Sequence, residues 1–102
     1  MIPDKINICG IPHSVKLCED NFTIDSHFGE ICYIKAEIRI NQGMPEPLQM
    51  QTLVHEWLHG ALVMIGRNDL SEDENLVQCV SVAINNTFTI KEDNNDRPAK
   101  NR

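Results

Sequence analysis

Residues 52–62 read TLVHEWLHGAL, and this stretch decides the fold because it is the centre of a long helical pattern. The preceding segment QGMPEP (residues 42–47) carries two prolines where the first turn of a helix tolerates a missing N–H. Gly66 follows at a position that suits a helix C-cap. The pattern therefore predicts a helix that ends at about Ile65. Its apolar arc, which would face a sheet, consists of Met50, Leu53, Val54, Trp57, Leu58, Ala61, Leu62 and Ile65.

The residues before this helix show the period-two alternation of apolar side chains that is typical of β-strands. Short alternating stretches contain Ile6, Ile8, Ile11, Val15 and Leu17, and they are interrupted by Gly10 and Pro12. Residues 30–41 read EICYIKAEIRIN, which predicts a hairpin that turns around Lys35-Ala36 and whose second strand has one wet face. Residues 18–29 are rich in turn formers and are predicted to be a loop.

A second helix is predicted to begin at Ser71, because Ser71 and Glu74 have the spacing of a capping box. Its apolar face would consist of Leu76, Val77, Val80, Ala83, Ile84 and Thr87 or Phe88. From Lys91 onward the chain is polar, as expected of a frayed tail. We therefore expect an α+β fold in which N-terminal strands precede two helices. Residues 1–90 would form a single domain, and residues 91–102 a polar, flexible C-terminal tail.

Composition and charge argue against several classes of partner. The chain has 102 residues, a hydrophobic content of 41% and a formal net charge of −6, without a cluster of Lys or Arg. This balance argues against a nucleic acid or an anionic membrane surface as the main partner. Asp4 and Lys5 lie where a signal peptide would be apolar, and no apolar run is long enough to span a bilayer, so we expect a cytoplasmic protein. The four cysteines are then expected to be reduced, mostly buried thiols.

The pattern His55-Glu56-x-x-His59 within the first predicted helix is typical of a metal site. Histidines four residues apart lie one turn above each other on the same face, so both imidazoles can reach one ion. Glu56 lies about 100° around the helix from His55, which suits a general base better than a third ligand. The alternative is a polar stripe on a core helix. Both histidines border the apolar arc, however, where half-buried imidazoles need partners, and a shared metal satisfies both.

A catalytic zinc site usually has three protein ligands and one open position. The second helix begins DLSEDENLVQ, which offers Asp69, Glu72, Asp73 and Glu74 as carboxylates. Acidic residues in a first turn also stabilise a helix without any metal, and Asp73 is closer than Glu74 to the apolar face. The residues alone therefore leave both Asp73 and Glu74 open as the third ligand.

HEWLH on one helix and ENLVQ at the start of the next together resemble the gluzincin arrangement, H-E-x-x-H followed by a glutamate ligand. The runs GEICYIKAEIRI, QTLVHEWLHGAL and DENLVQCVSVAI resemble the small phage-type members of the ImmA/IrrE family of zinc metallopeptidases. The resemblance implies a minimal zincin-like domain with one Zn²⁺ ion, held by His55, His59 and Glu74, and with Glu56 as the general base. It also suggests a supporting role for Gln78, whose neutral amide can still orient a histidine; the alternative is that Gln78 is simply an exposed residue of the helix.

These features predict a zinc metallopeptidase, a hydrolase that cleaves a peptide bond in an intracellular protein substrate; the resemblance suggests a phage or mobile-element repressor. A second interpretation is a metal-stabilised regulatory binding module without turnover, and a third is a metal-free pair of helices. The strand at residues 37–41 is a candidate to bind an extended peptide by edge pairing. Of the remaining candidates, His13 and His27 are expected at the surface and Tyr33 in the core. The sequence does not indicate an oligomeric state.

Overall fold

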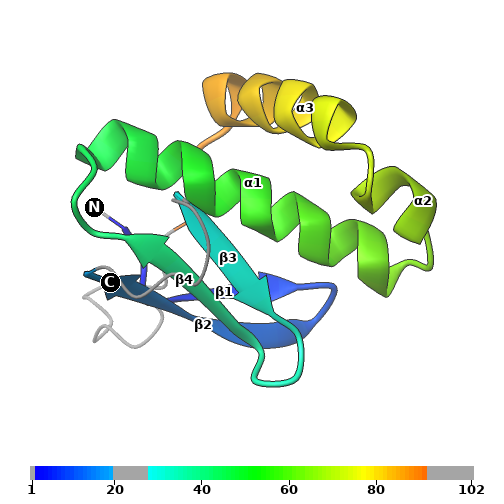
Figure 1. The fold of residues 1–102 in the computed structure, drawn as a ribbon, viewed down its shortest axis with the longest axis horizontal. Coiled ribbons are helices and arrows are strands. Elements are labelled where there is room, and N and C mark those ends of the chain that lie inside the picture. The colour runs from blue at the N-terminus through cyan, green and yellow to red at the C-terminus, as the bar shows by residue number, and fades with distance from the viewer. Residues whose placement is uncertain (1, 20–27, 92–102) are drawn as a thin grey trace, which may run out of the picture.

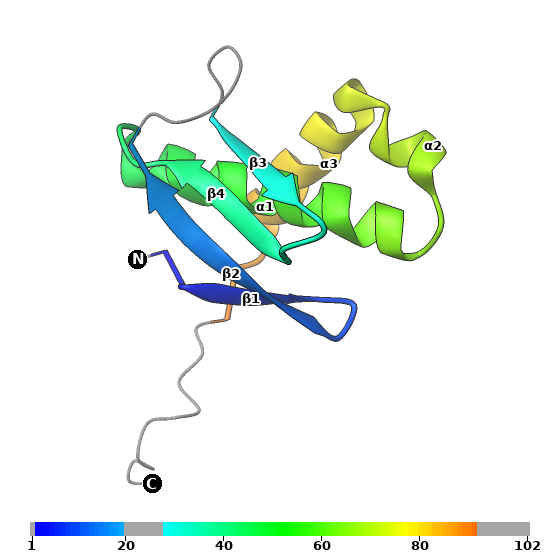
Figure 2. The same cartoon turned by 60° about the horizontal axis from the view of Figure 1, so that its bottom comes forward.

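The computed structural model describes residues 2–19 and 28–91. The elements are β1 (Lys5–Ile8), β2 (Ile11–Cys18), β3 (Gly29–Cys32), β4 (Glu37–Asn41), α1 (Glu46–Met64), α2 (Asn68–Ser71) and α3 (Glu74–Thr87). The strands form one sheet in the order β1-β2-β4-β3, α1 covers one face of it, and α3 packs on the other side of α1 (Figures 1 and 2). The predicted α+β class is confirmed, with three helices where two were expected.

The first hairpin explains how β2 accommodates a proline. Cys9 and Gly10 form its two-residue turn, both with positive φ angles (52° and 87°), so that Ile8 pairs with Ile11. Pro12 is therefore in the next, non-hydrogen-bonded pair of the antiparallel ladder, where its missing N–H would point away from β1. On its other side, the pairing with β4 begins only at Ser14. Pro12 thus interrupts no ladder bond, and β2 is continuous where the sequence predicted a break.

The second predicted hairpin is confirmed. Its second strand, β4, is however an inner strand of the sheet and not an edge strand. β3 and β4 pair in antiparallel fashion, and Ala36 completes the turn with a φ of 50°. β4 also pairs with β2 in parallel, so it lies inside the sheet. Edge pairing of a peptide with residues 37–41 is therefore excluded, because both sides of β4 already have a partner strand. The free edge of this hairpin is β3.

The core lies between α1 and the inner face of the sheet. Its buried centre consists of Ile8, Val15, Ile38, Ile40 and Leu53. Gly60 allows this close packing, because a Cβ there would lie 2.9 Å from the Cδ1 atoms of Ile8 and Ile31. Trp57 packs against the core and donates a hydrogen bond from Nε1 to the Asn7 carbonyl (3.0 Å), so α1 is fixed to the first hairpin as well.

The helical region after α1 differs from the prediction. α1 ends near Gly66 as expected, but the chain then forms the single turn α2 before α3 begins at Glu74. Asp73 is the N-cap of α3, and its side chain accepts a hydrogen bond from the Leu76 N–H (3.1 Å). The predicted capping box is therefore wrong. The Ser71 side chain is directed to α1 instead, where it meets His59.

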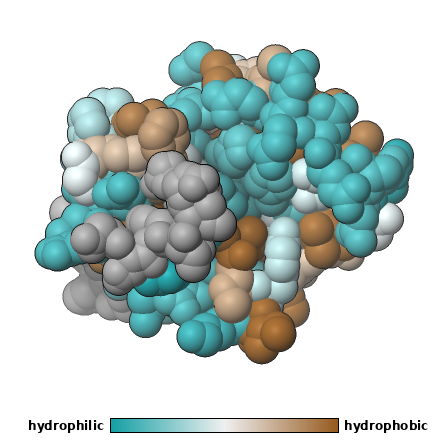
Figure 3. Space-filling view, in the orientation of Figure 1, coloured by the Kyte–Doolittle hydropathy of each residue, from teal (hydrophilic) through white to brown (hydrophobic). Residues whose placement is uncertain are grey.

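α3 buries less apolar surface than its pattern predicts. Its buried residues are Val77 and Ser81, whereas Val80, Ala83 and Phe88 are exposed. Its neighbours among the described elements are α1 and α2, and it does not contact the sheet. The face seen in Figure 3 is mostly hydrophilic, with small separate hydrophobic patches. α3 is therefore attached to the domain through one face only.

Two further expectations concern the thiols and the membrane. All four cysteines are free, as predicted, but Cys9 and Cys79 are exposed and the other two are half-buried, so the predicted burial is wrong. Within residues 2–19 and 28–91, no helix has the length and apolar character needed to cross a bilayer. The residues predicted to form the C-terminal tail, apart from Lys91, and most of the predicted loop lie outside the described residues.

The packing of β3 against α1 yields a stability prediction. An ideal Cβ on Gly29 would lie 2.7 Å from Thr52 Cγ2 and 2.9 Å from the Arg39 backbone oxygen, which cannot move without distorting β4. Gly29→Ala should therefore lower the free energy of unfolding by about 1–3 kcal/mol, measured by urea denaturation. Gly60→Ala is the matched control. Its two tight contacts are with the Cδ1 ends of isoleucine side chains, and alanine gains about 1 kcal/mol of helix propensity, so the loss should be smaller. Equal losses would contradict this packing.

Candidate metal centre

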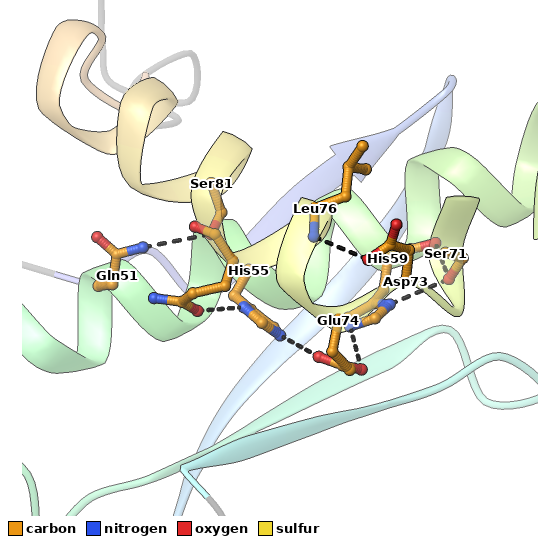
Figure 4. Close-up of polar contacts among 9 residues, drawn as sticks. Gln51, His55, His59, Ser71, Asp73, Glu74, Leu76 and Ser81 are labelled. Carbon is orange, nitrogen blue, oxygen red and sulfur yellow. Dashed lines mark hydrogen bonds and ion pairs between the residues drawn. The ribbon is translucent and has the colours of Figure 1, made fainter. Parts of the chain in front are cut away.

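Three side chains from two helices converge between α1 and α3. His55 and His59 lie one turn apart on α1, with ring centroids 4.9 Å apart. Glu74, the first residue of α3, places its two carboxylate oxygens 3.4 Å from His55 Nε2 and 3.2 Å from His59 Nε2. In Figure 4 the Glu74 carboxylate lies between the two imidazoles. This arrangement explains why helix spacing alone identified the histidine pair, whereas the third residue depended on how α3 docks.

The geometry fits a divalent metal ion. The candidate ligand atoms of His55, His59 and Glu74 all lie within 4.8 Å of one another. Two donor atoms that each lie about 2.0–2.1 Å from a tetrahedral zinc ion are about 3.3 Å apart, close to the observed nitrogen–oxygen separations. The Glu74 side chain is 70% exposed, whereas His55 and His59 are 19% and 13% exposed, so the group is open to solvent on the Glu74 side. This group could therefore hold a metal ion and leave an open position.

The sequence left Asp73 and Glu74 as alternatives for the third ligand, and the structure gives these two carboxylates different contacts. Glu74 belongs to the histidine group, and Asp73 does not. The Asp73 side chain turns back to cap α3 at the Leu76 N–H. Adjacent residues at a helix start point in directions about 100° apart, so one carboxylate caps while the other faces α1. The geometry therefore favours Glu74 as the third candidate ligand.

Each histidine is oriented by a neutral group on its other ring nitrogen. His55 Nδ1 lies 2.9 Å from Gln78 Oε1, and His59 Nδ1 lies 3.0 Å from Ser71 Oγ. An amide oxygen is an acceptor, so His55 Nδ1–H donates to Gln78, and Nε2 is left with its lone pair directed toward Glu74. Gln78 is exposed, yet it contacts one of the two candidate metal-binding histidines. Ser71 was missed, because its spacing to Glu74 gave it a complete role in a capping box.

Burial keeps His59 in the form that binds metals. Removal from water lowers the pKa of His59, although the nearby Glu74 carboxylate acts in the opposite direction and His55 adds a smaller lowering effect. A histidine with a lowered pKa is neutral at physiological pH, and only neutral imidazole coordinates a metal ion. His59 is therefore in the ligand form without first having to lose a proton.

Glu56 lies near the His55–His59–Glu74 group and is buried from solvent. Its side chain is buried, and this burial, with smaller contributions from Glu74 and Glu30, raises the pKa of Glu56 to about 7. Its Cγ would be 3.7 Å from a Cβ on Gly29, so Glu56 faces β3 and not α3. A buried carboxyl that titrates near neutral pH can both accept and return a proton, as general acid–base catalysis requires. A bound cation would favour its ionised form.

Two predictions of burial are wrong: His13 was expected at the surface, and Tyr33 in the core. His13 is buried on β2; Nδ1–H donates to the Ile11 carbonyl (2.9 Å), and Nε2 has no hydrogen-bond partner among the described residues. Tyr33 is 43% exposed in the β3–β4 turn instead of in the core. Partial burial and the charge of Glu56 raise the pKa of Tyr33, while a hydrogen bond with Ser71 acts to lower it. Tyr33 is thus near the site. His27 lies outside the described residues.

Comparison with known proteins identified no relative: no family model, no curated protein and no solved structure matches this chain. The chemical case for the site therefore depends on the geometry given above.

The raised pKa of Glu56 predicts how the metal-free protein responds to pH. In the folded chain Glu56 holds its proton up to about pH 7, whereas its ordinary value is 4.5. The free energy of unfolding therefore falls as the pH rises from 4.5 through 7. Above pH 7 the full cost of ionising the buried Glu56 carboxyl is present. Metal-free Glu56→Gln should be more stable than wild type at pH 8.5, by up to about 3 kcal/mol, with little difference at pH 4.5. Urea titrations at both pH values would show this, and a difference independent of pH would contradict the assignment.

Proposed function

We propose that this protein is a zinc-dependent metallopeptidase that hydrolyses a peptide bond in an intracellular protein substrate. The observation that carries this proposal is the convergence of His55, His59 and Glu74 beside the buried carboxyl of Glu56. Two imidazoles and one carboxylate with an open fourth position are typical of catalytic zinc sites, whereas structural zinc sites are closed and richer in cysteine. No cysteine belongs to this group among the described residues.

The chain's own residues have distinct roles in the proposed reaction. When bound, a zinc ion supplies a Lewis acid that polarises the scissile carbonyl and acidifies the attacking water. Glu56 accepts the proton of that water at its carboxylate and returns it to the leaving amine nitrogen. Gln78 and Ser71 contact Nδ1 of His55 and His59, which leaves Nε2 of each imidazole available as a ligand. Glu74 would complete the ligand set and would neutralise one of the two positive charges.

The free edge of β3 is where we place the substrate. Phe28 accepts a hydrogen bond from the Asn41 N–H (2.9 Å), so the alternating antiparallel pattern leaves the backbone groups of Gly29 and Ile31 directed away from β4. These groups can pair with an extended peptide. Figures 1 and 2 show β3 as the strand on the side of the sheet toward α3. Because Gly29 adjoins Glu56, a peptide on this edge would pass beside the general base.

The similarity of GEICYIKAEIRI, QTLVHEWLHGAL and DENLVQCVSVAI to phage-type ImmA/IrrE metallopeptidases supports the same proposal and suggests a phage or mobile-element repressor as substrate. A metal-stabilised regulatory binding module without turnover is the second candidate. It is favoured by the short connections around the site, which offer little surface for a specificity cleft: α1 and α3 are separated only by residues 65–73. Both candidates require the metal, and only the first requires Glu56.

Glu56→Gln separates these two functions. Zinc-loaded wild type, incubated with a mixed peptide library, should generate new peptide termini detectable by mass spectrometry. Glu56→Gln should retain zinc but lose at least about 100-fold in rate, because the proton acceptor is gone. Glu72→Gln, an exposed carboxylate close in the chain to the site, is the matched control and should keep full activity. Cleavage that survives Glu56→Gln would contradict the peptidase mechanism, and zinc-loaded wild type that cleaves nothing would favour the binding module.

A further inference from the structure

A polar stripe of α3 lies against a polar stripe of α1. Residues spaced by three or four positions share one face of a helix. The stripe on α3 consists of Glu74, Gln78, Ser81 and Asn85. The stripe on α1 consists of Gln51, His55 and His59. Each member of one stripe has a polar contact with the other stripe at 3.4 Å or less, so the candidate metal centre is one end of a longer polar interface.

Gln51 lies at the other end of this interface, where its side-chain amide has both of its ends bonded to α3. Its Nε2 donates to Ser81 Oγ (3.4 Å), as Figure 4 shows, and its Oε1 accepts from Asn85 Nδ2 (3.1 Å). Ser81 is fully buried and donates its own proton to the Gln78 carbonyl (3.1 Å), so its oxygen is left as an acceptor for Gln51. A shift of α3 by one residue would move these partners about 1.5 Å along the axis and about 100° around it, which breaks both hydrogen bonds.

We propose that Gln51 is a positioning residue for the metal centre, which sets the register of α3 along α1 and thereby places Glu74 opposite His55 and His59. The inference rests on the proposed function, because it assumes that these three residues hold a metal ion. Glu74 precedes Ser81 by seven positions, or about 10 Å along the helix, so Gln51 acts through α3 and not by contact with the ion. Neither the H-E-x-x-H pattern nor the spacing to Glu74 indicates Gln51.

The hydrogen bonds of Gln51 add a directional constraint to the apolar contact between the helices. Val77 of α3 is fully buried, but apolar packing is non-directional and tolerates sliding better than a hydrogen-bonded pair does. Selecting one register is the best-attested role of polar groups between packed helices. Because this constraint needs no metal, Glu74 is already near the histidines in the metal-free chain. A ligand that is in place before binding costs less to order, which favours tight binding of the ion.

Zinc affinity, measured by competition with a chromophoric chelator, tests the proposal. Gln51→Met keeps the length of the side chain and removes both hydrogen bonds, and it should weaken zinc binding on the order of tenfold. Asn85→Leu gives the same test from the other helix and should also weaken binding. The double variant should lose less affinity than the two single effects added as free energies, because both changes remove one shared hydrogen bond. Asn86→Leu, at the adjacent and exposed amide, is the matched control and should leave the affinity unchanged.

A second readout separates positioning from a general loss of stability. At saturating Co²⁺ in place of zinc, the visible absorption bands of Gln51→Met and Asn85→Leu should shift toward those of Glu74→Ala, because the Glu74 carboxylate is displaced from the ion. A residue that only stabilises the fold would leave the spectrum of the saturated protein unchanged. An unchanged zinc affinity or an unchanged cobalt spectrum in these two variants, with wild type binding zinc normally, would overturn this inference and leave the proposed function intact. Failure of wild type to bind zinc at all would overturn both.

Discussion

The position of Glu74 against His55 and His59 is the constraint on which the rest of the site depends. α3 meets α1 through polar and apolar contacts: beyond the histidine–glutamate group, Gln51 donates to Ser81 (3.4 Å) and accepts from Asn85 (3.1 Å), and Val77 of α3 is fully buried. A metal ion shared by the two helices would link them further. The sheet and α1, in contrast, share an apolar core that does not need the metal.

The candidate site thus lies between α1, which is packed on the sheet, and α3, which contacts α1 and α2 but not the sheet. α1 is fixed by the buried core and by the Trp57 bond to the first hairpin, so His55, Glu56 and His59 are presented by a well-supported helix. Glu56 faces the sheet and is dry, which raises its pKa, whereas Glu74 comes from α3 and is exposed. Two carboxyls of the same chemistry thus suit two roles, proton transfer and metal binding, because of the layers they face.

The parts of this structure that the sequence predicted are those set by local signals. Helix spacing places His55 and His59 on one face, and alternation around Lys35-Ala36 predicts the second hairpin. The parts that it could not predict depend on contacts between distant segments. Ser71 matched a capping box, and only the α2 turn shows that it faces His59 while Asp73 caps α3. Likewise, the parallel pairing of β2 with β4, which makes β4 an inner strand, has no signature in either strand alone.

The central claim is that His55, His59 and Glu74 hold one metal ion. Zinc content tests it most directly, measured by plasma mass spectrometry on protein purified without chelator, with Asp73 and Glu74 replaced in turn. Asp73→Ala removes the cap of α3, at a cost of about 1 kcal/mol, and Glu74→Ala removes the carboxylate between the histidines. We expect wild type and Asp73→Ala to retain near-stoichiometric zinc and Glu74→Ala to lose it. Zinc retained in Glu74→Ala, or a zinc-supplemented wild type that holds none, would contradict the three-residue metal centre.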